Sequence, residues 1–207
     1  MGNKRLAVFA SGRGSNFNAI LKKIKDHYIP ATFELCITNS PGAGVIEIAS
    51  SNDIPVKIFQ SREFPDTSAF NDAILRELLS AKIDYIILAG YLKMIGSQIV
   101  DQYSNKIINI HPALLPSFGG KGMYGHYVHE AVFERGVKYS GVTIHLVNNE
   151  YDAGPIVLQE PVRIDDAFTA KEIAERVLEV EHRLFPEAVK FLVEDRLEIK
   201  GSRVRIK

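Results

Sequence analysis

The feature that most constrains the fold of this 207-residue chain is a regular alternation of short apolar runs and amphipathic segments in its first half. Apolar runs without polar alternation predict strands that are buried on both faces, and apolar residues at helical spacing between them predict covering helices. Together they indicate a parallel sheet between helices. The predicted strands cover residues 6–10, 32–38, 56–58, 85–89 and 107–111, and the predicted helices cover residues 17–24, 43–51, 68–80 and 96–103.

The second half of the chain follows a different pattern. Residues 139–147 alternate between polar and apolar side chains, which predicts a half-buried strand with Thr143 and His145 on one face. A loop at 148–155 and an apolar run at 156–160 predict a strand that returns antiparallel. We therefore predict an α/β fold, in which a Rossmann-like N-terminal half with parallel strands continues into a mixed sheet with an antiparallel C-terminal part.

A long helix and a small hairpin complete the chain. Thr169 and Glu172 have the spacing of a capping box, and they predict a helix that starts there and runs to about Glu194. Two short apolar runs within residues 197–206 predict a hairpin. Because no linker or internal repeat separates these elements, we expect residues 1–207 to form a single domain.

Charge and cysteine content argue against several classes of protein. The 25 Lys and Arg residues are balanced by 25 Asp and Glu residues, and this zero net charge argues against a nucleic-acid partner or an anionic membrane surface. The sequence shows no secretory segment and no long apolar span, so we expect a cytoplasmic protein. The single cysteine, Cys36, lies in an apolar run, which predicts a buried, inert thiol and excludes a disulfide within the chain.

A glycine-rich turn, Ser11–Asn16, follows the first predicted strand and precedes the first helix. Free amides at a helix start bind anions, and Ser15 or Asn16 is suited to cap the helix. The turn is not a dinucleotide fingerprint, because Phe17 stands where the third glycine would be, and it lacks the lysine of a nucleoside-triphosphate loop. A plain phosphate site and a purely structural turn are the two interpretations.

The predicted strand at 107–111 ends in two polar side chains. Asn109 and His111 are two residues apart, so they share one face of the strand, and Pro112 stops further pairing. Ligands of open α/β sheets bind at the carboxyl ends of the strands. An amide donor and an imidazole at this position indicate a functional pair, and the alternative is a satisfied polar pair at a strand end.

Three further features have both a structural and a functional interpretation. The stretch Ser117–Gly125 contains four glycines and predicts a mobile loop. His126 and His129 follow near the start of a helix, and because no third ligand is apparent, we favour a solvated helix face over a metal site. Glu181 falls on the apolar stripe of the last helix, so it is either a locally paired or a functional carboxylate.

The order of four motifs carries a resemblance to a known family. The motifs are Ser11–Asn16, Asn109–Pro116, Gly141–His145 and Asp152–Pro155. Over essentially the whole chain they resemble the 10-formyltetrahydrofolate-dependent formyltransferases, and the first motif is similar to the glycinamide ribonucleotide branch. The resemblance implies a formyltransferase fold, with a phosphate-binding half at 1–103 and a catalytic and folate-binding half at 104–207. It also implies formyl transfer from 10-formyltetrahydrofolate, as co-substrate, to the amine of glycinamide ribonucleotide in purine biosynthesis.

The resemblance further implies roles for individual residues. Asn109, His111 and Asp152 match the catalytic trio, in which the first two stabilise a tetrahedral intermediate and Asp152 assists proton transfer and raises the pKa of His111. Glu181 matches the carboxylate that holds the glycinamide end. The other matches are Gly14, Ser15 and Asn16 for the substrate phosphate, and Leu92, Lys93, Met94 and Ile95, with Asn109, for folate. His145 and Thr143, which share a strand face, are expected to support Asp152. No metal is required, the partners are small-molecule substrates, and a monomer or homodimer is expected.

Two departures from the family pattern bear on folate binding. Lys93 stands where relatives often carry arginine, and Thr67 stands at the place of a folate-contacting arginine, for which Arg62 is a weak substitute. The alternative functions are formyl transfer to another amine or to water, and non-catalytic binding of a phosphorylated metabolite.

Overall fold

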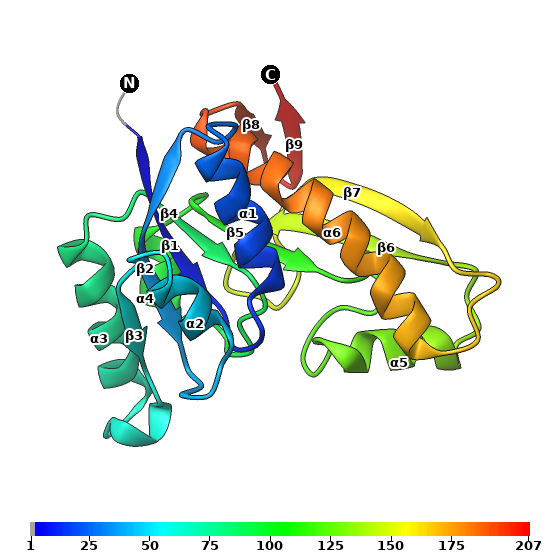
Figure 1. Ribbon diagram of the computed structural model, residues 1–207, viewed down its shortest axis with the longest axis horizontal. Helices are drawn as coiled ribbons and strands as arrows, with labels where there is room; N and C mark the ends of the chain where they lie inside the picture. The colour runs from blue at the N-terminus through cyan, green and yellow to red at the C-terminus, as the bar shows by residue number, and fades with distance from the viewer. Residues whose placement is uncertain (1–2) are drawn as a thin grey trace.

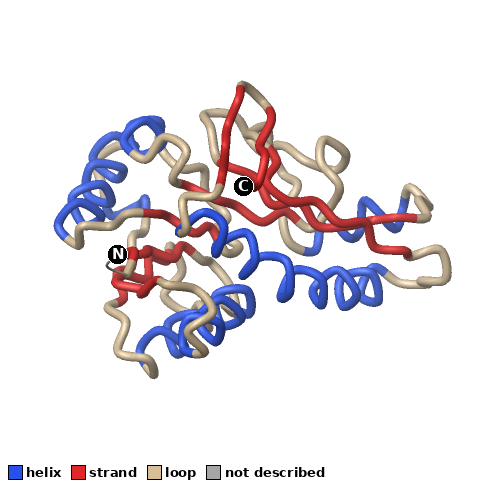
Figure 2. The backbone as a smooth tube through the Cα atoms, turned by 90° about the horizontal axis from the view of Figure 1, so that it is seen from above, coloured by secondary structure: helices blue, strands red, loops and turns tan. Residues whose placement is uncertain are grey.

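The computed structural model describes residues 3–207, and within them the chain forms one sheet of nine strands in the order β3-β2-β1-β4-β5-β6-β7-β9-β8. Helices lie on both sides of this sheet (Figures 1 and 2). The first five strands have the order expected of a Rossmann-like unit, and the sheet continues from them without a break into the second half of the chain.

The first half is a parallel sheet with helical connections. All pairings among β1 to β5 are parallel. The strands are β1 (Lys4–Phe9), β2 (Ala31–Thr38), β3 (Val56–Ile58), β4 (Tyr85–Leu88) and β5 (Ile107–His111). The helices are α1 (Ser15–Lys25), α2 (Val45–Ser50), α3 (Thr67–Ser80) and α4 (Ser97–Gln102), with a 3-10 turn η1 (Ser61–Glu63) before α3.

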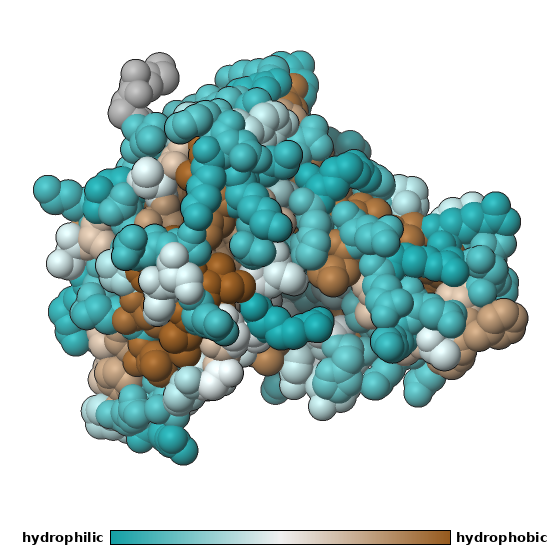
Figure 3. Space-filling model, in the orientation of Figure 1, coloured by the Kyte–Doolittle hydropathy of each residue, from teal (hydrophilic) through white to brown (hydrophobic). Residues whose placement is uncertain are grey.

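Successive residues of each strand enter two separate core layers. Leu6 and Val8 of β1 pack in a cluster that includes residues of α1, α2 and α6, whereas Ala7 and Phe9 pack in a cluster with α3 and α4. Because both faces are covered, Leu6–Phe9 of β1 and the whole of β4 are apolar, which explains why these stretches do not alternate. The outer side of the α1 and α6 layer is mostly hydrophilic, with hydrophobic residues gathered around α2 (Figure 3).

The second half extends the sheet with antiparallel strands. β6 pairs antiparallel with β5 and with β7, and a terminal hairpin joins the far edge through β9. Helix α6 lies on the same face as α1 and crosses β6 and β7 (Figure 1). These elements are α5 (His126–Glu134), β6 (Tyr139–Leu146), β7 (Ile156–Arg163), α6 (Ala170–Val193), β8 (Leu197–Lys200) and β9 (Arg203–Ile206).

The predicted α/β class and the change from parallel to antiparallel strands are confirmed, but two local predictions are wrong. The N-cap of α1 is Gly14, at φ 79°, and no side chain caps the helix, so neither Ser15 nor Asn16 has that role. β7 does not end at residue 160 but continues through Pro161. Proline is tolerated there because β9 pairs with β7 only at Ile156, so no second strand needs the missing N–H.

The predicted environment of Cys36 is confirmed. Its side chain is fully buried in the first core cluster, and burial raises the pKa of its thiol to about 12, so the thiol stays protonated and inert. None of the helices formed by residues 3–207 combines the length and the apolar character that crossing a membrane requires.

Candidate active site

The pairing of β5 with β6 brings four polar side chains to one face of the sheet. Asn109 lies directly opposite His145, and His111 lies directly opposite Thr143. Because side chains alternate along each strand, all four point to the same side, as predicted for each strand separately. His111, Thr143 and His145 are buried, while Asn109 is partly exposed.

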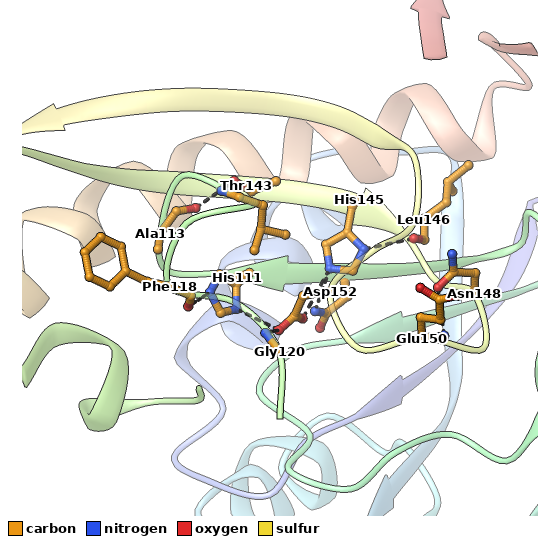
Figure 4. A network of polar contacts seen from close by, with 12 residues as sticks. His111, Ala113, Phe118, Gly120, Thr143, His145, Leu146, Asn148, Glu150 and Asp152 are labelled. Atoms are coloured by element: carbon orange, nitrogen blue, oxygen red, sulfur yellow. Dashed lines mark hydrogen bonds and ion pairs between the residues drawn. The ribbon is translucent and has the colours of Figure 1, made fainter. Parts of the chain in front are cut away.

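Asp152 approaches this group from the loop after β6 (Figure 4). Its Oδ2 atom lies 3.6 Å from His111 Nδ1 and accepts a hydrogen bond from the Gly120 N–H at 2.9 Å, and its Oδ1 atom lies 3.6 Å from His145 Nε2. The loop is held tightly because Gly154 packs against β6, where a Cβ atom would stand 1.7 Å from the Leu146 carbonyl oxygen. Asn109, His111 and Asp152 therefore converge as a polar trio.

The hydrogen bond of His111 to Phe118 determines which of its ring nitrogens carries the proton. Nε2 lies 2.8 Å from the Phe118 carbonyl oxygen, and because a carbonyl only accepts, Nε2 carries the proton. Nδ1 is left facing Asp152. Burial lowers the pKa of His111 more than Asp152 and the Phe118 carbonyl raise it. The predicted direction of the Asp152 effect, which raises the pKa of His111, is confirmed, but burial outweighs it.

His145 connects the other two members of the polar trio. Its Nδ1 atom lies 2.9 Å from the Leu146 carbonyl oxygen and donates to it, so in the neutral ring Nε2 accepts from Asn109 Nδ2 at 3.1 Å. This bond uses one amide hydrogen of Asn109 and leaves the second free. Burial alone would raise the pKa of Asp152, but His145, His111 and the Gly120 N–H together lower it, so Asp152 is a carboxylate at neutral pH.

Thr143 has a different position from the one expected. Its hydroxyl donates to the Ala113 carbonyl at 2.6 Å and accepts from the Leu115 N–H at 3.0 Å and from Gln159 Nε2 at 2.9 Å. Thr143 thus holds the turn after β5, in which the Leu115–Pro116 peptide bond is cis, and does not contact Asp152. Of the two, only His145 lies beside Asp152, with its Nε2 atom 3.6 Å from Oδ1.

The glycine-rich turn Ser11–Asn16 presents the free amides of α1. The first helical hydrogen bond runs from the Asn18 N–H to the Gly14 carbonyl at 2.9 Å, so the three preceding amides have no partner within the helix. Gly14 combines a positive φ with close packing, because a Cβ atom there would stand 3.0 Å from the Val45 Cα. Both the backbone angle and the space therefore favour glycine.

Glu181 reaches this turn from α6. Its side chain is buried, and its Oε2 atom accepts a hydrogen bond from Asn16 Nδ2 at 2.8 Å. Burial raises the pKa of Glu181 to about 7, and the bond from Asn16 opposes this only in part. Asn16 Oδ1 is buried without a hydrogen-bond partner in the part of the chain that the structure describes. Asn16 Oδ1 can therefore accept a further hydrogen bond, for example from a ligand.

The segment 92–95 follows β4 and is tied to the glycine-rich turn. The Leu92 N–H donates to Ser11 Oγ at 2.9 Å. Leu92 and Met94 are half exposed, Ile95 belongs to the second core cluster, and Lys93 Nζ donates to Ser61 Oγ at 3.0 Å. Neither Thr67 nor Arg62, the positions discussed for the missing arginine, borders the cavity described next.

One cavity of about 550 Å³ joins these groups. The residues that border it include the polar trio, His145, Glu181, Gly12–Asn16, segment 92–95 and part of the glycine-rich loop. A cavity of this size suits a small-molecule site with a few convergent polar groups. The structure thus brings together at this cavity every residue proposed for a site except Thr143. Thr143 is fully buried and does not border the cavity.

The chain matches the family model described as formyl transferase over residues 4–189. It is 44% identical to the chloroplastic phosphoribosylglycinamide formyltransferase of Arabidopsis thaliana, over 97% of this chain and 69% of that protein. It is 39% identical to the phosphoribosylglycinamide formyltransferase of Bacillus subtilis, over 92% of this chain and 95% of that protein. The chain belongs to the formyl transferase family.

A solved member of the formyl transferase family has nearly the same fold. Glycinamide ribonucleotide transformylase 1 from Symbiobacterium toebii aligns with a TM-score of 0.93 at 34% identity, covering 99% of this chain and 94% of that one. The mixed sheet described above is therefore the family fold.

Two histidines of α5 in this formyl transferase differ in environment. His126 is exposed, as predicted, and borders the cavity. His129 is buried, so the predicted solvated face is wrong there, because Val128 and Val132 pack α5 onto the first core cluster. Burial, with smaller contributions from His111 and His126, lowers the pKa of His129 to about 4. No group of three or more candidate metal ligands occurs within residues 3–207.

Sequence reasoning missed three groups that contact residues of the candidate site. The Phe118 carbonyl and the Gly120 N–H are backbone groups that most residue types can supply, so the side-chain pattern does not mark these two contacts. Ser11 bridges the glycine-rich turn and Leu92, and it also donates to Asn39 Oδ1 at 2.5 Å. Its position directly before a Gly-x-Gly turn was the only available signal.

Proposed function

We propose that this chain transfers a formyl group from 10-formyltetrahydrofolate to the amine of 5'-phosphoribosylglycinamide in purine biosynthesis. The names of the Arabidopsis and Bacillus relatives and of the Symbiobacterium structure support this reaction. The observation that carries the proposal is a single cavity bordered both by the anion-binding turn and by the polar trio. A phosphorylated amine bound at the turn would have its reacting end within the same cavity.

Asn109 and His111 have the donors that this reaction needs. Attack of an amine on a formyl carbon creates a tetrahedral centre with a negative oxygen, and preorganised donors stabilise that oxygen. The second amide hydrogen of Asn109 is free, because His145 uses only the first. His111 donates through Nδ1, since Phe118 already binds Nε2–H. His111 therefore has to take up a proton from solvent at Nδ1 in order to donate to the oxyanion, although burial keeps it neutral beforehand. It gives this proton back to solvent when the oxyanion collapses and the bond from the formyl carbon to the folate nitrogen breaks.

Asp152 makes that protonation possible. Its carboxylate lies 3.6 Å from His111 Nδ1, close enough to stabilise the imidazolium electrostatically. The developing oxyanion adds a second negative charge and raises the pKa of His111 further. Asp152 also borders the cavity, where it assists transfer of a proton from the attacking amine to the leaving folate nitrogen.

The remaining residues bind and orient the two substrates. Gly14, Ser15 and Asn16 hold the substrate phosphate with helix-start amides, and Glu181 holds the glycinamide end. A carboxyl whose pKa is about 7 accepts hydrogen bonds at neutral pH in its ionised form and donates in its protonated form. Segment 92–95 and Asn109 contact the folate, with Leu92 and Met94 offering exposed apolar surface.

The experiment mixes the purified protein with 10-formyltetrahydrofolate and glycinamide ribonucleotide and follows the absorbance of the released folate. Release that depends on the ribonucleotide, with formylglycinamide ribonucleotide detected by mass spectrometry, supports the proposal. Release at the same rate without any amine would instead identify water as the acceptor. Ligand binding without release would identify a non-catalytic binding protein. Either result contradicts the proposed reaction.

The cytoplasmic location, the monomeric or homodimeric state and the division into halves at residues 103 and 104 stay predictions. The Arabidopsis relative is named as chloroplastic, so relatives do not share one compartment. Light scattering on the purified protein measures the oligomeric state directly.

A further inference from the structure

Arg13 is a cation of the glycine-rich turn that no interaction described so far uses. It is exposed, borders the cavity, and has no carboxylate within ion-pair distance among residues 3–207. Its backbone is held from behind: the Val45 N–H donates to the Gly12 carbonyl at 3.1 Å, and a Cβ atom on Gly44 would stand 3.3 Å from the Arg13 Cα. The backbone of Arg13 is therefore fixed while its guanidinium is uncommitted.

No other permanent cation at the cavity is uncommitted. Among the described residues that border it, the only Lys or Arg besides Arg13 is Lys93. Lys93 Nζ donates to Ser61 Oγ of η1 and lies 5.9 Å from the centre of the Phe70 ring, so it is engaged beside α3. His111 is kept neutral by burial. Arg13 is thus the remaining source of full positive charge.

The glycine-rich turn needs such a charge if it binds a phosphate ester. A phosphate monoester carries about −1.5 to −2 charges at neutral pH, whereas a helix N-terminus supplies about +0.5. Glu181, which borders the same cavity, adds a negative charge whenever it is ionised. A guanidinium in the turn supplies the missing charge and matches two phosphate oxygens at once.

We propose that Arg13 is a specificity residue that pairs with the phosphate of the substrate and selects phosphate monoesters over the corresponding ribosides. The proposal rests on the proposed function, since it names the substrate group that the turn recognises. Arg13 acts on binding alone, because the formyl group is transferred at the polar trio.

The test compares Arg13→Gln and Arg13→Lys with wild type, using glycinamide ribonucleotide and its dephosphorylated riboside as acceptors. We expect Arg13→Gln to raise KM for the ribonucleotide about tenfold at low salt with kcat within about twofold, and to leave KM for the riboside unchanged. Arg13→Lys keeps the positive charge but loses the planar guanidinium, which can bind two phosphate oxygens at once. Its KM should therefore lie between those of wild type and Arg13→Gln. The difference between wild type and Arg13→Gln should shrink as salt is raised to about 0.5 M.

A binding measurement separates this proposal from the proposed reaction. Calorimetry with inorganic phosphate should show about tenfold weaker binding to Arg13→Gln than to wild type. If no acceptor is formylated but this difference is present, the reaction fails and the role of Arg13 stands. Equal phosphate affinities, or an equal rise of KM for riboside and ribonucleotide, overturn the role of Arg13. Arg135→Gln is the matched control, because Arg135 is an exposed residue at the end of α5 without an ion pair in the described chain.

Discussion

Replacing Asp152 with asparagine removes the negative charge beside His111 while keeping the size and shape of the side chain. The amide oxygen of asparagine still accepts from the Gly120 N–H, which in the wild type donates at 2.9 Å. The loop geometry is therefore expected to survive, and the loss of charge is the main change. This makes Asp152→Asn a direct test of electrostatic stabilisation of the His111 imidazolium.

The geometry sets the size of the effect. Two unit charges 3.6 Å apart interact by about 1 kcal/mol at the dielectric constant of water and by about 5 kcal/mol at an effective value of about 20. The side chains of His111 and Asp152 are only 4% and 13% exposed, which favours the upper part of this range. We expect kcat to fall at least about a hundredfold, equivalent to about 2.7 kcal/mol in the barrier.

The pH profile of the variant gives the sign of the effect. Burial already lowers the pKa of His111, and Asp152 is the largest contribution that opposes this. Without the carboxylate the pKa falls further, so less imidazolium forms at any pH. The decline of kcat on the alkaline side should therefore begin at a lower pH, measured by folate release between about pH 5 and 9. An NMR titration of His111 checks the same shift without catalysis.

The control is Glu150→Gln, which removes a carboxylate from the same loop at an exposed position that borders the cavity. Its kcat and pH profile should match those of wild type. In Asp152→Asn, KM for the ribonucleotide should stay within about twofold, because the glycine-rich turn is unchanged. A kcat within threefold of wild type, or an unmoved pH profile, would refute the electrostatic role of Asp152.

Three further predictions concern single residues. His111→Ala should lower kcat at least about a hundredfold and leave calorimetric phosphate affinity unchanged, and near-normal turnover would exclude a role for the imidazole. Glu181 has a folded-state pKa of about 7 against the usual 4.5, so ionisation costs the folded state about 3 kcal/mol once the pH exceeds 7, and none below 4.5. Urea unfolding of wild type should therefore lose about 3 kcal/mol between about pH 4.5 and 8 relative to Glu181→Gln, and parallel profiles would contradict burial of the carboxyl. Thr143→Val should destabilise the fold by about 1–3 kcal/mol, because the Ala113 carbonyl and the Leu115 N–H lose their partner. Thr143→Ser keeps the hydroxyl and should be close to wild type, and a Thr143→Val variant as stable as wild type would refute the role of the hydroxyl.

Much of the fold was accessible from the sequence because its signals are local. The alternating residues of β6 set it apart from the uniformly apolar β4, but the predicted half-burial of β6 is wrong. Residues 140–146 are all buried, and Thr143 on the polar face is bonded to the turn after β5. The same period of two placed Asn109 and His111 on one face of β5.

The N-cap of α1 and the environment of His129 were predicted wrongly because both depend on tertiary packing. Local propensity favours Ser15 or Asn16 as a cap, but Asn16 instead donates to Glu181, which is 165 residues away in sequence. His129 is polar and near a helix start, yet packing of α5 against the core buries it. No spacing rule within one helix contains either contact.

The sequence alone determined which residue types are present and which of them share a face of a strand or helix, because these properties depend only on the local period of the backbone. The tertiary structure decided how far apart the faces lie and how much water reaches them. The β5–β6 register set Asn109 against His145, and the loop after β6 brought Asp152 to His111. Burial then decided the sign of the pKa change at His111, because desolvation depends on all surrounding atoms and not on any one neighbour.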